Sequence, residues 1–345
     1  MGRVGKELNA LPASVKKAVS RIRKTAATTA GSFDMFPEGE KVLLGLSGGK
    51  DSWVLLHWML YSQRVAAKKF EIEAVIIDPG FEGFRSQEVH DYCRDVLGVK
   101  VTIIKEDFNP IIDQYNSRPG QSYCSFCARL RRGCLYTYCV RNGIKTMALG
   151  HHMDDALNTM LLNITRCGRM ASMPPVLHAD DYDIAVVRPF IKTAEADIRT
   201  YSRYLEREQG MPIVSCSCPY AGQPEHGRVI SAKILESIEQ TVPGAKWSMV
   251  QALGNIAPRF MHDTKLHPFT ERPTDRTFKQ IRPHGPPVKR APKDTDAKGE
   301  TTVTEGAEAP AVEQTAPLEV EVPCPASACA GCPMARGCGG CGKAE

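Results

Sequence analysis

The sequence lacks the features that would place the protein in a membrane or in the secretory pathway. No uninterrupted apolar run comes near the roughly 18 residues that a membrane-spanning helix needs. The first residues carry Glu7 and several lysines instead of the apolar segment of a secretory signal. The chain also has no convincing internal repeat. We therefore expect a cytoplasmic protein with no membrane partner.

Acidic residues are scarce at the start of the chain. Residues 1–30 hold seven Lys or Arg against one Glu, and residues 272–298 hold eight Lys or Arg against three Asp. The 345 residues together carry a formal net charge of +5, with 42% hydrophobic and 24% charged residues. Basic flanks suit a polyanion, so RNA is one predicted partner. A solvated basic helix with a soluble tail remains the alternative interpretation.

Short β-branched runs alternate with helical patterns through the first 255 residues. The expected strands are residues 41–46, 71–78, 100–105, 145–150 and 184–189. The expected helices are residues 12–27, 52–65, 86–97, 124–142, 154–166, 194–209, 228–241 and 244–255. This alternation predicts an α/β fold with a doubly wound parallel sheet, whose ligands bind beyond the carboxyl ends of the strands.

The pattern also predicts four parts of the chain. Residues 1–35 form a basic helical segment, and residues 36–263 form the main domain. A proline-rich and then acidic composition makes residues 264–322 a disordered linker. Residues 323–345 are a cysteine-rich tail.

The most informative run follows the first expected strand and reads Ser47, Gly48, Gly49, Lys50, Asp51 and Ser52. Glycines let backbone N–H groups close on phosphate oxygens, and the following helix directs its positive end toward them. A carboxylate beside phosphates favours a role for Asp51 in holding Mg²⁺. The spacing is not that of the Walker loop. It resembles the pyrophosphate loop of ATP pyrophosphatases, which adenylate a substrate.

Thirteen cysteines are many for a reducing compartment and indicate metal or sulfur chemistry. Cys124 and Cys127 form a C-x2-C pair at the start of an expected helix, where thiolates are favoured. The next cysteine pair, Cys216 and Cys218, could complete either a three-cysteine [4Fe–4S] cluster or a closed zinc site. Four other cysteines lie among apolar residues and are expected in the core: Cys93, Cys134, Cys139 and Cys167.

A third motif follows the strand expected at residues 145–150. It contains Gly150, His151 and His152 and then two aspartates, Asp154 and Asp155. These residue types suit a metal or the phosphates of a nucleotide. An aspartate at a helix start is also a common cap, so this alternative stays open.

Taken together, these stretches resemble the TtcA family of tRNA 2-thiocytidine synthetases. The matching stretches are SGGKDS (47–52), CSFCARLRRG (124–133), LGHHMDD (149–155), LLN…GRMASMPP (161–175), VVRPF (186–190) and SCSC…GRVI (215–230). The resemblance implies a HUP-type sheet with a helical C-terminal extension. It also implies ATP-dependent replacement of the O2 of an anticodon-loop cytidine by sulfur, with Mg²⁺ and a [4Fe–4S] cluster.

The resemblance assigns roles residue by residue. The implied ATP-binding residues are Ser47, Gly48, Gly49, Lys50, Asp51, Ser52, Asp78, Gly150, His151 and Asp155. The implied catalytic residues are Asp51, Cys124 and Cys127, and the implied RNA contacts are Arg129, Arg131 and Arg132. The implied partners are tRNA and a cysteine desulfurase as sulfur donor, with a homodimer as a further expectation. Sulfur would arrive as a cysteine persulfide or on an open iron.

Two features depart from the family pattern. Only Ser217 separates the cysteines of the third motif, and we favour Cys216 over Cys218 as the third cluster ligand. The tail adds Cys329, Cys332, Cys338 and Cys341, which are spaced for zinc or a second cluster. A loose, redox-sensitive tail is the alternative. The rival functions are thiolation of uridine, action on a substrate other than tRNA, and a non-catalytic iron–sulfur or zinc carrier.

Overall fold

The computed structural model describes residues 8–115, 123–179, 182–214 and 226–267. The chain divides into two units, residues 1–285 and 286–345, and every described residue belongs to the first. In this described part, no helix is long and apolar enough to cross a membrane. Several expected site residues lie outside the described residues: Cys216, Cys218, Cys329, Cys332, Cys338 and Cys341. Most of the expected linker and the whole expected tail also lie outside them.

The described residues form one six-stranded sheet with the strand order β3-β2-β1-β4-β6-β5. The strands are β1 (Lys41–Gly45), β2 (Glu71–Asp78), β3 (Val101–Lys105), β4 (Thr146–Ala148), β5 (Val176–His178) and β6 (Ala185–Val187). Every neighbouring pair is parallel except β5 and β6, which pair antiparallel at one edge. The predicted α/β class and its parallel sheet are therefore confirmed.

Helices connect these strands and continue beyond the sheet. They are α1 (Ala13–Ser32), α2 (Lys50–Val65), α3 (Ser86–Tyr92), α4 (Asn109–Tyr115), α5 (Tyr123–Arg141), α6 (Met153–Cys167), α7 (Glu195–Gln209), α8 (His226–Thr241) and α9 (Ala245–Ala252). Short helical turns occur at η1 (Leu8–Ala10), η2 (Cys93–Leu97) and η3 (Pro258–Phe260).

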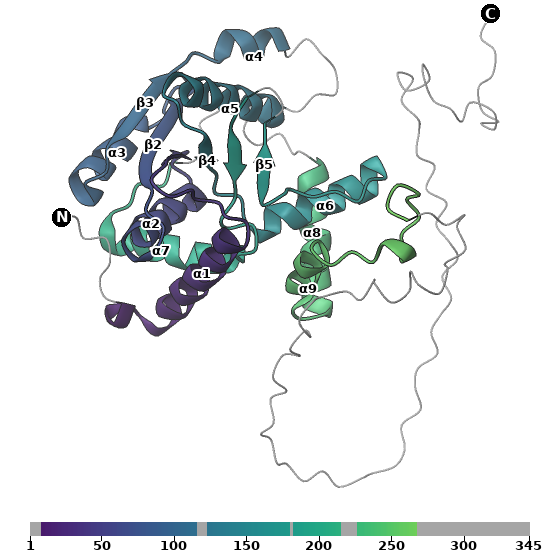
Figure 1. Cartoon of the computed structure of the whole chain (residues 1–345). Helices are drawn as coiled ribbons and strands as arrows, with labels where there is room; N and C mark the ends of the chain where they lie inside the picture. Colours follow the sequence, from purple (N-terminus) through teal and green to yellow (C-terminus); the bar gives the residue numbers. More distant parts are fainter. Residues whose placement is uncertain (1–7, 116–122, 180–181, 215–225, 268–345) are drawn as a thin grey trace, which may run out of the picture. The chain divides into compact units, whose positions relative to one another are not determined.

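The two faces of the sheet are covered by different helices (Figure 1). Val42 and Leu44 of β1 pack on one face with apolar residues of α1, α2, α3 and α7. Leu43, which points the opposite way, packs with residues of α4 and α5. This alternation follows from the two-residue period of a strand. Since both faces are covered, β1 is apolar at every internal position, as expected for a parallel sheet.

A smaller apolar cluster attaches the C-terminal helices. Met153, Leu157 and Met160 of α6 pack against Leu235 of α8 and Val250 of α9. In Figure 1 these three helices lie together beside the sheet. Five buried side chains are a small core, so polar contacts at this junction also help to hold α8 and α9 in position.

The structure differs from the sequence-based elements in three places. Neither the short helix α4 nor the edge strand β5 was predicted, because each is too short to show a clear period. The helix expected over residues 86–97 changes to a π-helical turn at Cys93 and ends before Gly98, whose φ is +66°. The other expected strands and helices are present with boundaries shifted by a few residues.

Candidate active site

The loop of residues 47–52 lies at the carboxyl end of β1, as the sequence predicts. Gly48 has a φ of +79°, and a Cβ there would lie 2.9 Å from the Cβ of Val214. The carbonyl of Gly48 accepts a hydrogen bond of 2.9 Å from the backbone N–H of Val214. The backbone N–H of Gly49 donates to the hydroxyl of Ser47 at 3.3 Å, and the hydroxyls of Ser47 and Ser52 lie 3.1 Å apart. The loop is thus held in a defined conformation at the start of α2.

Gly150 brings the second motif against this loop. A Cβ at Gly150 would lie 3.0 Å from the carbonyl carbon of Asp51 and 3.1 Å from the backbone nitrogen of Ser52. Only glycine allows two backbones to approach this closely without displacing one of them. The structure therefore joins the two motifs, which lie about 100 residues apart in the sequence, at the ends of the neighbouring strands β1 and β4.

His152 connects the carboxylates at this junction. Its Nε2 lies 3.6 Å from Oδ1 of Asp51 and 3.4 Å from Oδ2 of Asp155. The same Oδ2 of Asp155 accepts a hydrogen bond of 3.0 Å from the backbone N–H of His152. Asp155 therefore caps α6, which is the structural alternative that the sequence left open, and it also borders the loop through His152.

Lys50 is paired with two carboxylates. Its Nζ lies 3.0 Å from both carboxylate oxygens of Asp51 and 3.0 Å from Oε1 of Glu195. Burial alone would lower the pKa of Lys50, but the charges of Asp51 and Glu195 outweigh it and raise that pKa. Burial would raise the pKa of Glu195, whereas hydrogen bonds from Arg199 and Lys50 lower it to about 2. Lys50 is therefore a charged lysine with two anionic partners.

Asp154 links this site to two other helices. Its Oδ2 accepts a hydrogen bond of 3.0 Å from the backbone N–H of Glu195, at the start of α7. Its Oδ1 lies 3.0 Å from Nζ of Lys246 in α9. The Asp154 side chain is 10% exposed and that of Lys246 is 19% exposed. An ion pair therefore ties α9 to the α6 side chain that also holds the backbone N–H of Glu195 at the start of α7.

Two arginines, Arg188 and Arg132, act electrostatically on His151 of the second motif. Burial lowers the pKa of His151 to about 4, and the nearby charges of Arg188 and Arg132 lower it as well. Arg188 follows β6, and its Nη1 donates to the carbonyl of Pro174 at 2.7 Å. Burial, and then the charge of Arg132, lowers the pKa of Arg188. His151 is therefore neutral near pH 7.

The C-x2-C pair lies at the start of α5. Cys124 and Cys127 are three residues apart on this helix, and Cys127 is buried. Arg131, one turn after Cys127, has two buried nitrogens, Nε and Nη2, without a hydrogen-bond partner. Its guanidinium lies 5.6 Å from the ring centre of Phe84. In the described part of the chain, no three His, Cys, Asp or Glu side chains are grouped to hold a metal ion.

Comparison with known proteins decides the family. The sequence profile of the PP-loop domain matches residues 17–208. A tRNA-cytidine(32) 2-sulfurtransferase of Syntrophotalea carbinolica is 34% identical over 259 residues, which cover 75% of this chain and 98% of that protein. The protein of the same name from Geobacter sulfurreducens is 37% identical over 253 residues, or 73% and 96% of the two chains. This chain belongs to the TtcA family.

A solved structure shares the fold of this TtcA family member. It is the U34-tRNA thiolase NcsA from Methanococcus maripaludis, with its [4Fe-4S] cluster. The two chains superpose with a TM-score of 0.53 at 22% identity, over 71% of this chain and 80% of the other. The likeness establishes a common architecture for the sheet and its helices.

Asp78, the remaining ATP-binding residue implied by the TtcA family, lies at the carboxyl end of β2. Its Oδ1 accepts a hydrogen bond of 3.1 Å from the backbone N–H of Gly80, and its Oδ2 accepts one from the hydroxyl of Ser86. Both oxygens therefore hold the connection between β2 and α3. Asp78 lies on the same rim of the sheet as the loop, two strands from Gly150.

The single cysteines divide between core and surface in this TtcA family member. Cys93 and Cys139 are buried, as expected. Cys134 is partly exposed, and the prediction that Cys167 belongs to the core is wrong because this residue is exposed. Cys167 is the last residue of α6, where the helix extends beyond the elements that pack on it. Apolar neighbours in the sequence do not bury a residue at such a helix end.

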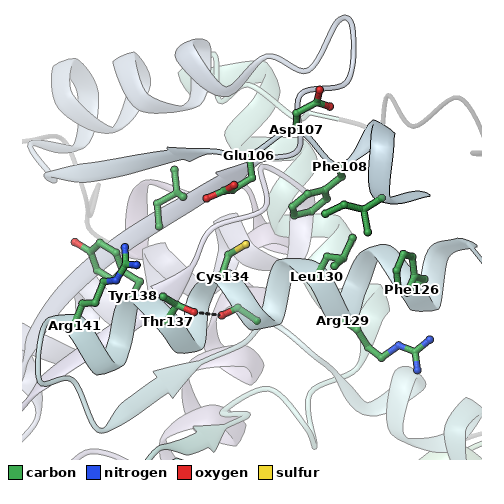
Figure 2. A pocket seen from close by; sticks show the side chains of 13 residues that line it. Glu106, Asp107, Phe108, Phe126, Arg129, Leu130, Cys134, Thr137, Tyr138 and Arg141 are labelled. Atoms are coloured by element: carbon green, nitrogen blue, oxygen red, sulfur yellow. Dashed lines mark hydrogen bonds between the residues drawn. The ribbon is translucent and has the colours of Figure 1, made fainter. Parts of the chain in front are cut away.

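A separate hollow of about 890 Å³ lies between α5 and the segment that joins β3 to α4. Figure 2 shows Glu106 and Cys134 facing each other across it, with Phe108 and Leu130 beside them. Burial, followed by the charge of Glu106, raises the pKa of the Cys134 thiol. Arg129 lines this hollow, whereas Arg132 acts on His151. All three arginines expected to bind RNA, Arg129, Arg131 and Arg132, lie on α5.

Sequence reasoning missed three side chains that the structure brings to this site: Glu195, Lys246 and Arg188. Glu195 and Lys246 lie in helices far along the chain and belong to no motif. Arg188 stands in the VVRPF stretch, and an arginine directly after a short apolar strand was the available signal.

Proposed function

We propose that this chain is an ATP-dependent tRNA sulfurtransferase that converts cytidine 32 of the anticodon loop to 2-thiocytidine. The observation that carries this proposal is the backbone contact of Gly150 with Asp51 and Ser52, which assembles one site from two motifs. The second support is family membership, because the chain spans 98% of a protein named tRNA-cytidine(32) 2-sulfurtransferase.

The first chemical step is adenylation. The backbone N–H groups and hydroxyls of residues 47–52 bind the β- and γ-phosphates of ATP, as the end of a strand and the start of a helix favour. The O2 of cytidine attacks the α-phosphorus, the bond to the β-phosphate oxygen breaks, and pyrophosphate leaves. Lys50 exchanges Glu195 for the polyphosphate and balances the charge that develops on this leaving group.

The carboxylates beside the loop are proposed to complete the ATP site. Asp51 fits a Mg²⁺ ligand, because its carboxylate lies at the loop and its partners are the exchangeable side chains Lys50 and His152. When bound there, Mg²⁺ would neutralise part of the polyphosphate charge. Asp155 orients His152, and Asp78 on the same rim is assigned to the nucleoside part of ATP.

The cysteines of α5 fit an iron–sulfur ligand pair. They are one helical turn apart, Cys127 is buried, and the unpartnered nitrogens of Arg131 on the next turn suit an anionic neighbour. We propose that Cys124, Cys127 and either Cys216 or Cys218 hold a [4Fe–4S] cluster. Such a cluster would supply the chemistry that activates sulfur.

In the second step sulfur replaces the adenylated oxygen. The nucleophile is hydrosulfide, formed when a thiol reductant supplies two electrons to the persulfide sulfur of the donor. Its sulfur bonds to C2 of the base, the bond from C2 to the activated oxygen breaks, AMP leaves, and the proton passes to solvent. The base of an anticodon loop is already single-stranded, so binding it costs only a few kcal/mol of unstacking. Arg129, Arg131 and Arg132 on α5 are assigned to contacts with tRNA phosphates.

The remaining assignments concern partners and the tail. A cysteine desulfurase is the proposed sulfur donor, the chain is proposed to act in the cytoplasm, and a homodimer is the proposed assembly. The tail cysteines Cys329, Cys332, Cys338 and Cys341 are proposed to bind zinc or a second cluster, on their spacing alone.

Mass spectrometry of tRNA nucleosides tests the proposed function. Deleting the gene should remove 2-thiocytidine, and the intact gene should restore it. Asp51→Ala and Cys124→Ala should each fail to restore it while remaining folded. Cys167→Ala is the matched control, because Cys167 is exposed at the end of α6 and is assigned no role in ATP or cluster binding, and it should restore thiolation fully.

The other outcomes separate the rival functions. Loss of a thiouridine with unchanged 2-thiocytidine would retain the enzyme class and replace the substrate. No change in any thionucleoside would favour a non-tRNA substrate or a non-catalytic metal carrier. Full thiolation by the Asp51 or Cys124 variant would disprove the role assigned to that residue.

A further inference from the structure

The described residues contain a buried cationic cluster that the adenylation step above does not use. Arg188 is 6% exposed, and its Nε has no hydrogen-bond partner. Its neighbour His151 has a buried Nδ1 that is also unpartnered. Most buried polar groups in proteins are satisfied, so two such atoms just beyond the ends of the paired strands β4 and β6 indicate a site for a ligand.

The charges around these atoms define what that ligand must be. Burial, and then the charge of Arg132, lowers the pKa of Arg188, and the charges of both arginines also act on His151. The one carboxylate in the described chain that acts on His151 is Asp155, which is already engaged with His152. A buried guanidinium without a counter-charge is costly, and an anion with several acceptor oxygens removes that cost.

The cluster is close to the pyrophosphate loop but separate from it. His151 directly follows Gly150, whose backbone contacts the loop at Asp51. Arg188 follows β6, and β4 lies between β6 and β1 in the sheet. Two strand spacings amount to about 10 Å, so a group bound by Arg188 is not the one held by the loop on β1.

We propose that Arg188, Arg132 and His151 form a second anion subsite that binds a phosphate ester. Guanidinium groups bind phosphate oxygens through paired N–H groups, and a neutral imidazole adds a hydrogen bond without adding charge. The phosphate ester has two sources, the α-phosphate of the nucleotide, which becomes that of AMP, or a backbone phosphate of the RNA beside the target base. The choice of these two sources rests on the proposed function, whereas the anion subsite itself does not.

Binding measurements on the full chain, prepared without oxygen, distinguish these sources. The probes are AMP, pyrophosphate and an RNA hairpin with the anticodon-loop sequence. The variants are Arg188→Gln, which keeps a donor for the carbonyl of Pro174, and Arg188→Lys, which keeps the charge. Arg207→Gln, in the exposed last turn of α7, is the matched control.

A nucleotide source predicts that Arg188→Gln weakens AMP binding about 10- to 100-fold and leaves pyrophosphate binding unchanged. Arg188→Lys should lose less AMP affinity than Arg188→Gln, and Arg207→Gln should lose none. An RNA source predicts the same loss for the hairpin, with a slope of log affinity against log salt that is smaller by about 1. These readouts do not require thiolation, so they stand or fall independently of the cytidine assignment.

Two results overturn the proposal. One is unchanged affinity for both AMP and the hairpin in a folded Arg188→Gln variant. A lower melting temperature of that variant would not rescue the proposal, because loss of a purely structural contact with Pro174 also lowers it. The other is an equal loss for AMP and pyrophosphate, which means that Arg188 acts through the loop. If Arg188→Gln does not fold, Arg132→Gln on α5 gives the same readouts with the same two overturning results.

Discussion

Asp154 offers the sharpest test of how the C-terminal helices support the site. Its two carboxylate oxygens have separate partners, the backbone N–H of Glu195 and the ammonium of Lys246. A hydrogen bond to a charged group contributes about 1.5–3 kcal/mol. The ion pair of Asp154 with Lys246 is neither fully exposed nor fully buried, and Glu236 is a second partner of that lysine. We therefore assign the Asp154–Lys246 pair about 1–2 kcal/mol of stabilisation.

These values predict an ordered series of variants. Asp154→Ala loses both contacts and should lower the free energy of unfolding by about 3–5 kcal/mol. Asp154→Asn keeps an oxygen for the N–H of Glu195 and should lose about 1–2 kcal/mol, as should Lys246→Met. The double variant with Asn and Met should lose little more than either single one, because the two changes remove the same interaction.

Urea denaturation and hydrogen exchange provide the measurements. Because α8 and α9 are attached through a small apolar cluster, exchange in α9 should rise about tenfold in Lys246→Met, for a loss near 1.4 kcal/mol. The KM for ATP should rise in Asp154→Ala, since Glu195 and its partner Lys50 lose their support. Fully additive losses in the double variant would refute the argument, as would an Asn variant as unstable as the Ala variant.

Three further predictions follow from the local geometry. Gly48→Ala should cost about 1–3 kcal/mol of stability and weaken ATP binding, because φ is +79° and the new Cβ would lie 2.9 Å from that of Val214; unchanged urea midpoints would contradict it. The pKa of Glu195 falls from 4.5 to about 2 in the folded protein, so its stabilising effect is complete above about pH 4.5 and disappears as the pH falls toward 2. The stability difference between wild type and Glu195→Gln should therefore shrink between urea titrations at pH 7 and pH 3, and a constant difference would refute the assignment. Cys139→Ser should lose about 1–3 kcal/mol by burying a hydroxyl, whereas Cys167→Ser should change stability by less than about 0.5 kcal/mol; similar losses would contradict their different burial.

Much of the sheet could be predicted because its signals are local. The longer strands coincide with runs of β-branched residues. The longer helices show apolar residues at helical spacing, and both patterns can be read from a single sequence. The elements that escaped prediction, α4 and β5, span seven and three residues, which is too few for a period. Cys167 was misplaced for a related reason, since sequence neighbours do not show where a helix passes beyond its packing partners.

The same difference between local and long-range signals applies to the candidate site. The loop of residues 47–52 could be predicted because its chemistry depends on consecutive residues. The pairing of Lys50 with Glu195 and the link from Asp154 to Lys246 could not, because their partners come from different helices and carry no motif.

The sequence alone determined which chemistry this protein carries, a pyrophosphate loop, a helical cysteine pair and a histidine-aspartate motif at strand ends. It did so because phosphate and metal binding depend on fixed local spacing. Only the tertiary structure decided that Gly150 meets Asp51, that Asp154 reaches α9, and that Arg188 is buried at the end of the strand that pairs with β4. These contacts depend on which strands are neighbours and which helices cover them, and that order results from packing the whole chain.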